Sequence, residues 1–88
     1  MMWNYVTLAD ETALAHSEVR GDGTVLVRAE RPVDFGFDSA SCVLPAFSWS
    51  EVEGFSEQEV AELDRLLREN APLIFELAER RASSRPAA

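Results

Sequence analysis

The sequence predicts an α+β fold in which an antiparallel meander of three or four strands is packed by two C-terminal helices. Aromatic and β-branched residues with strand-like alternation concentrate in the first half of the chain. The glycines of Gly21-Asp22-Gly23 favour a hairpin turn between two such stretches. The second half begins with a helix-capping motif at Ser56 and continues with apolar residues at helical spacing. We expect one compact domain at residues 1–82 and a flexible tail at residues 83–88.

The expected strands follow one another along the first half of the chain. The stretch Trp3–Leu8 is rich in the aromatic and β-branched residues that favour strands. The two hairpin arms are Ala13–Arg20 and Thr24–Glu30, and apolar and charged side chains alternate along the second arm. Pro32 has no N–H to donate to a neighbouring strand, so we expect it to end this arm. A last strand is predicted at Phe37–Leu44.

The segment Ala46–Phe55 has no clear period. Phe47 and Trp49 are compatible with a packed connector that lies across the edge of the sheet, and Gly54 interrupts the segment before the first helix. We therefore expect a connector here and assign neither a strand nor a helix.

The first predicted helix begins with a capping box, in which Ser56 is the N-cap and Glu59 reaches back to it. Phe55 and Val60 have the spacing of a hydrophobic staple around that cap. The apolar stripe of this helix comprises Val60, Leu63, Leu66 and Leu67.

A second helix is predicted after Asn70, because a proline such as Pro72 is favourable in the first turn of a helix and unfavourable in its interior. Arg80 and Arg81 fall near its C-terminus, where positive charge is favourable. Its apolar stripe comprises Leu73, Ile74, Leu77 and Ala78.

Size and composition predict a protein of the cytoplasm. The chain has 88 residues, of which 47% are apolar, and this supports a small packed core. A single cysteine, Cys42, cannot form an internal disulfide, which suits a reducing compartment. The first residues lack the basic start of a signal peptide, and no apolar run reaches the roughly 18 residues of a membrane span.

The charge is the most informative feature for function. Sixteen acidic residues stand against eight arginines, lysine is absent, and the formal net charge is −8. Between Glu51 and Asp64 the chain has six carboxylates and no basic residue. Such a body repels nucleic acids and anionic membranes and attracts basic protein surfaces.

Part of this acidic run has an ordinary structural explanation, since Glu59 serves the capping box and Asp64 can pair with Arg68 one helical turn later. An ordinary solvated face is therefore one interpretation of the run. The other is a fixed negative surface that stands in for phosphates, with an aromatic anchor from Trp49, Phe35 or Phe37 if these are exposed. The candidate partner-binding residues are Asp34, Asp38, Glu51, Glu53, Glu57, Glu59, Glu62 and Trp49.

No pattern in the chain indicates catalysis, a metal or a cofactor. His16 is the only histidine, and neither it nor Cys42 stands in a local nucleophile motif. The glycine pair at Gly21 and Gly23 lacks the third glycine and the following helix of a phosphate loop. Asp34 and Asp38 are too sparse for a calcium loop. We expect a non-enzymatic protein without a cofactor.

In size, charge, absence of lysine and lack of catalytic motifs, the chain resembles the small acidic inhibitors of phages and mobile elements, such as anti-CRISPR and DNA-mimic proteins. The resemblance implies a basic nucleic-acid-handling partner, such as a CRISPR effector, whose DNA binding the protein blocks. It implies no direct contact with nucleic acid or membrane, and a monomer or weak dimer. Two alternatives are an antitoxin or immunity protein that neutralises a basic toxin, and an accessory domain whose acidic surface maintains solubility.

Overall fold

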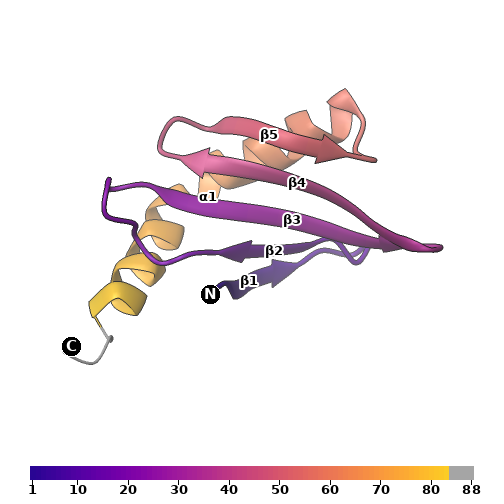
Figure 1. Ribbon diagram of the computed structural model, residues 1–88. Helices are drawn as coiled ribbons and strands as arrows, with labels where there is room; N and C mark the ends of the chain where they lie inside the picture. Colours follow the sequence, from indigo (N-terminus) through magenta and orange to yellow (C-terminus); the bar gives the residue numbers. More distant parts are fainter. Residues whose placement is uncertain (84–88) are drawn as a thin grey trace.

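The computed structural model describes residues 1–83 and contains one five-stranded sheet and one long helix. All neighbouring strands are antiparallel and follow chain order, β1-β2-β3-β4-β5 (Figure 1). The α+β class is confirmed, but the prediction of three or four strands and two helices is wrong in both numbers. The elements are β1 (Trp3–Thr7), β2 (Ala13–His16), β3 (Val25–Val33), β4 (Gly36–Leu44), β5 (Ser48–Glu53) and α1 (Glu57–Ser83).

The additional strand, β5, lies within the segment that was expected to be a connector. It pairs with β4, and Trp49 is the register partner of Cys42. Serine and glutamate make this segment polar, but an edge strand has only one neighbour and leaves its other side to water. The register shifts between Ser39 and Ser41, where Glu51 has a positive φ of 53° and forms a bulge.

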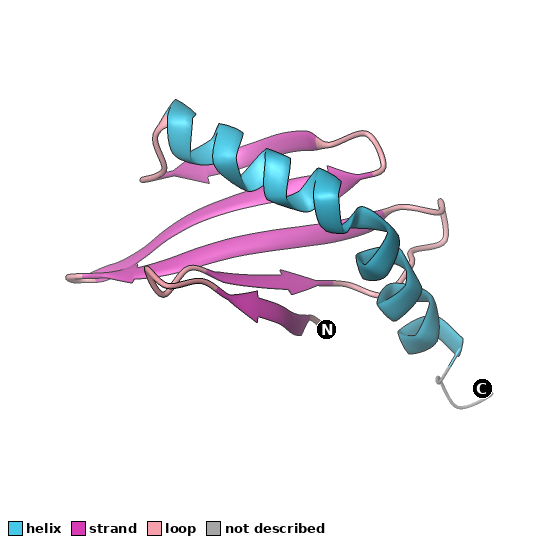
Figure 2. Ribbon diagram, turned by 180° about the vertical axis from the view of Figure 1, so that it is seen from behind, coloured by secondary structure: helices cyan, strands magenta, loops and turns pink. Residues whose placement is uncertain are grey.

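The single helix α1 continues through Pro72, so the expected boundary at Asn70 does not exist. Proline removes one backbone hydrogen bond and is disfavoured inside a helix by about 3 kcal/mol. The apolar stripe nevertheless stays in phase on both sides, and its buried members are Leu63, Leu67, Ile74 and Ala78. Pro72 itself is exposed, and α1 changes direction midway as it crosses the sheet (Figure 2).

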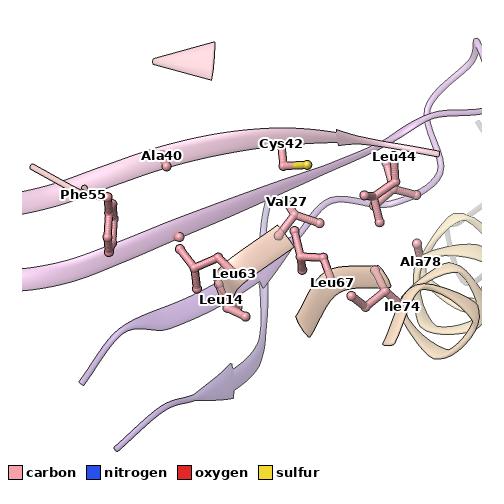
Figure 3. Packing of buried hydrophobic residues seen from close by; sticks show 12 residues of the cluster. Leu14, Val27, Ala40, Cys42, Leu44, Phe55, Leu63, Leu67, Ile74 and Ala78 are labelled. Atoms are coloured by element: carbon pink, nitrogen blue, oxygen red, sulfur yellow. The ribbon is translucent and has the colours of Figure 1, made fainter. Parts of the chain in front are cut away.

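The core lies between α1 and one face of the sheet. Val27 and Cys42 are register partners in the two central strands, and both point toward the helix at Leu67 (Figure 3). Cys42 is fully buried, and burial raises the pKa of its thiol to about 12. The core is a single cluster of Leu14, Val25, Val27, Ala29, Ala40, Cys42, Leu44, Phe55, Leu63, Leu67, Ile74 and Ala78.

The other face of the sheet is covered by no helix among the described residues (Figure 1). Because side chains alternate along a strand, this face receives the residues between those of the core. One row across it consists of Ala15, Arg28, Ser41 and Ser50. We refer to it as the open face.

The β3–β4 hairpin extends beyond both of its neighbours. β2 pairs with β3 only as far as Glu30, and β5 pairs with β4 only from Ser39 onward. Residues 31–38 therefore form a two-stranded ribbon that projects from the sheet (Figure 1). The prediction that Pro32 ends the strand is wrong, because Pro32 pairs with Phe37 inside this ribbon. Proline is tolerated there since β3 has lost its partner on the β2 side.

No helix within residues 1–83 combines the length and apolar character that crossing a membrane requires. Of the predicted tail at residues 83–88, Ser83 is the last residue of α1 and the others lie outside the described residues.

Candidate functional site

The sheet topology gathers carboxylates at the end of the molecule from which the β3–β4 hairpin projects. The β1–β2 turn, the end of β5 and the start of α1 all lie at this end (Figures 1 and 2). These segments and residues 30–38 of the hairpin contribute nine of the sixteen acidic residues, with Arg31 as the only basic residue among them. We call this set the acidic end: Asp10, Glu11, Glu30, Asp34, Asp38, Glu53, Glu57, Glu59 and Glu62.

Arg31 is the centre of this end and contacts three of its carboxylates. Its Nη2 lies 2.7 Å from Oδ2 of Asp38, and its Nη1 pairs with Glu59 and lies 3.6 Å from Oδ2 of Asp10. The guanidinium also stacks 4.6 Å from the ring centroid of Phe55. These five residues, the Arg31 cluster, connect the hairpin, the β1–β2 turn and the start of α1. The sequence gives no local sign of the cluster, because its members are far apart in the chain.

The three carboxylates of this cluster are held by internal bonds. Glu59 also completes the predicted capping box, which is confirmed: its Oε1 accepts from the Ser56 N–H at 2.9 Å, and its own N–H donates to Ser56 Oγ at 3.1 Å. The hydrogen bond from Arg31, followed by that from Ser56, lowers the pKa of Glu59 to about 2. The pKa of Asp10 is also lowered, chiefly by hydrogen bonds from Thr12.

Because Gly54 has no side chain, the Asp38 carboxylate can occupy the space next to its backbone. The φ of Gly54 is +86°, and a Cβ at this position would overlap with the Asp38 side chain. The turn from β5 to α1 thus places backbone where only glycine fits, and this lets Asp38 face Arg31.

The remaining six carboxylates of the acidic end form no ion pair within residues 1–83. All six residues are exposed, so they carry negative charge that the protein does not neutralise locally. They are Glu11, Glu30, Asp34, Glu53, Glu57 and Glu62. Four of them, Asp34, Glu53, Glu57 and Glu62, belong to the predicted partner-binding set.

Two other predicted residues, Glu51 and Trp49, are engaged elsewhere. The Glu51 carboxylate lies 3.5 Å from Nη1 of Arg28, whose Nη1 also donates to Ser41 on the open face. Trp49 is half-buried, and its indole N–H donates to Oδ1 of Asp64 at 2.9 Å. Burial acts to raise the pKa of Asp64, but the hydrogen bonds from Arg68 and Trp49 outweigh this effect and lower it overall. Trp49 therefore ties β5 to α1.

The tip of the hairpin carries the exposed aromatic residues of this end. Phe35 is fully exposed, and Phe37 is 64% and Val33 47% exposed. Val33 and Phe35 flank Asp34, and Phe37 adjoins Asp38. The exposed aromatic side chains beside these acids are therefore Phe35 and Phe37, whereas Trp49 is half-buried. The sequence contains these residues as Phe-Gly-Phe, yet only the length of the hairpin leaves them uncovered.

A second concave region lies between β1 and α1, away from the acidic end. It is a mostly apolar groove of about 410 Å³ lined by Tyr5, Val6, Leu8, Leu66, Asn70, Leu73 and Leu77. Its two polar groups satisfy each other, since the Tyr5 hydroxyl donates to Oδ1 of Asn70 at 2.7 Å.

The single histidine is part of the packed sheet. His16 is buried in β2 with its Nδ1 2.8 Å from the Ser17 carbonyl oxygen, and its ring centroid lies 6.1 Å from that of Trp3 with the two rings tilted by 34°. No group of three or more potential metal ligands occurs within residues 1–83.

In comparisons with protein-family models, with curated proteins and with solved structures, nothing matches this chain.

Proposed function

We propose that this protein is a small non-enzymatic inhibitor that binds a basic, nucleic-acid-handling protein through its acidic end and blocks DNA binding. The observation that carries the proposal is the collection of nine carboxylates around a single arginine, six of them exposed and without an ion pair in residues 1–83. A CRISPR effector is the partner class that the resemblance favours.

The electrostatics of this end suit a surface that normally binds phosphates. In a nucleic-acid-binding groove, arginine and lysine side chains contribute binding free energy because they neutralise phosphate charge and release counterions. Carboxylates on a rigid body offer the same charge. They also speed the encounter with a cationic groove, and this effect weakens as salt screens the charges.

The Arg31 cluster and Gly54 support the proposal because together they fix the four segments that carry the charges. The hairpin, the β1–β2 turn and the start of α1 are joined by Arg31, and Gly54 positions the end of β5 against Asp38. A fixed arrangement loses less conformational entropy on binding than a flexible acidic segment does.

The test uses two purified guide-loaded effectors, a Cascade complex and Cas9, with a fluorescent target duplex. The wild-type protein should prevent duplex binding by one of them, and inhibition should weaken steeply from about 50 to about 300 mM NaCl. The variant E53Q/E57Q/E62Q should lose inhibition by about tenfold or more, since it removes three exposed charges of the acidic end.

A matched control removes three charges from the part of α1 that lies outside the acidic end. The variant E69Q/E76Q/E79Q has the same net charge as the first variant and should inhibit nearly as well as the wild type. Equal loss in both variants would show that only total charge matters. If neither effector is inhibited, the effector proposal is wrong, and rescue from a basic toxin becomes the next test.

A further inference from the structure

We infer that the tip of the β3–β4 hairpin, formed by Val33, Phe35 and Phe37, is the apolar anchor of the interface and inserts into an apolar recess between the cationic side chains of the partner. This inference rests on the proposed function and adds to it the element that determines specificity and residence time. The partner is thus a basic nucleic-acid-binding surface that contains an apolar recess.

The tip residues do not contribute to the core. Phe35 and Phe37 are exposed, and neither they nor Val33 belongs to the core cluster or to the side chains packed against it. Exposed large apolar side chains that gather in one place are typical of interaction sites. The exposed apolar residues outside the tip, such as Val52 and Leu73, lie on other elements.

The turn itself does not require Phe35. Its φ is +73°, a region that glycine and asparagine adopt more readily than a bulky residue does. A phenylalanine that is both exposed and in a strained backbone conformation is poorly explained by folding stability, and such positions cluster at functional sites.

The three side chains form a wedge that is apolar on both sides. Val33 continues the alternation of Val27 and Ala29, so it lies on the side of the sheet that faces α1. Phe37 continues the alternation of Ser41 and lies on the side of the open face. Phe35 is at the apex between them. Because β2 and β5 stop short of this ribbon, the wedge projects freely (Figure 1).

The base of the wedge is fixed. Arg31 and Asp38 bridge the two strands at a position where the ribbon leaves the sheet, and Arg31 also binds Glu59 at the start of α1. A projecting two-stranded ribbon is marginally stable by itself, so this bridge preorganises the tip for insertion.

The charges around the wedge indicate which kind of partner surface it can bind. Asp34 lies in the turn, and Glu30, Glu53, Glu57 and Glu62 lie behind it without an ion pair in the described residues. An anionic membrane or a second acidic end would be repelled. A cationic surface with an apolar recess would attract the carboxylates and bury the aromatic side chains. Other interfaces have the same arrangement, in which a buried aromatic anchor is surrounded by polar contacts.

The test measures association and dissociation rates on immobilised guide-loaded Cascade and Cas9 for wild type and for F35S/F37S. The variant should dissociate about tenfold faster or more, while its association rate and the salt dependence of that rate stay close to those of wild type. The charge variant E53Q/E57Q/E62Q should do the opposite, lowering the association rate and its salt dependence. F35W/F37W should retain slow dissociation.

Two controls distinguish a loss of the apolar anchor from a defect in folding. L73S removes an exposed apolar side chain from the groove at α1 and should bind as wild type does. The thermal melting temperature of F35S/F37S should match that of wild type, because its two residues lie outside the core.

The outcomes separate the two proposals. If F35S/F37S dissociates as slowly as wild type while the charge variant binds poorly, the anchor is wrong and the proposed function stands. If L73S weakens binding as much as F35S/F37S, the specific role of the tip is wrong. If wild type binds neither effector, both proposals fail.

Discussion

Arg31 on β3 and Asp38 on β4 form a bridge across the hairpin, with Nη2 of the arginine 2.7 Å from Oδ2 of the aspartate. Their side chains are only 19% and 17% exposed, so the bridge is shielded from water more than the pair of Arg28 and Glu51 or the three ion pairs along α1. It joins the two strands at the base of the ribbon that carries the aromatic tip.

Replacing Arg31 by methionine should destabilise the fold by about 2–4 kcal/mol, because it leaves Asp38 and Glu59 without their shared cation in a partly buried site. Urea unfolding followed by circular dichroism measures this change. The double variant R31M/D38N should lose less than the sum of the single variants, since the two side chains interact directly. Additive losses would contradict the bridge.

The stability of the protein should depend on the ionisation of Glu59 at acidic pH. Its native pKa of about 2 is below the ordinary value of 4.5, so its contribution is complete above about pH 4.5 and is lost as the pH falls toward 2. E59Q should flatten the loss of stability over this range, and glutamine can still serve the capping box. Thermal melts between these pH values measure the effect. A slope in E59Q equal to that of wild type would show that Glu59 is not the group responsible.

Replacing Gly54 by alanine should destabilise the fold by about 1–3 kcal/mol, because the added Cβ overlaps with Asp38 and the backbone has a positive φ. The measurement is again chemical unfolding. G21A is the matched control, since nothing lies within 4 Å of a Cβ at Gly21. A G54A protein as stable as G21A would show that Asp38 does not need the space above Gly54.

Replacing Pro72 by alanine should raise the free energy of unfolding by about 1–3 kcal/mol, because alanine restores a backbone donor inside α1. Pro72 is exposed, so the change removes little packing. The melting temperature should rise together with the helical signal in circular dichroism. A fall in stability would mean instead that α1 needs its change of direction to cover the sheet.

Local patterns predicted the elements whose interactions are close in sequence. The capping box at Ser56, the pair of Asp64 and Arg68 at 2.7 Å, and the antiparallel pairing of β2 with β3 are all confirmed. Each depends on residues within a turn, a helical repeat or a hairpin. The buried position of Cys42 also follows from simple alternation along β4.

The predictions that were wrong concern elements whose structure depends on contacts with distant parts of the chain. Pro72 and Asn70 favour a helix boundary, but burial of Leu67 and Ile74 against the sheet favours one helix. The polar residues of β5 disfavour a strand, but the exposed edge of β4 provides a partner for it. In both cases the apolar stripe or the free edge outweighs a local propensity of about 1–3 kcal/mol.

By itself the sequence determined the charge of this protein and its division into a β-rich half and a helical half. Only the tertiary structure decided which carboxylates are neutralised, because Arg31 contacts Asp10, Asp38 and Glu59, which lie in three different segments of the fold. It also decided that Phe35 and Phe37 stay uncovered, since this depends on where β2 and β5 end. Local chemistry acts between neighbours in the chain, whereas neutralisation and burial depend on neighbours in space.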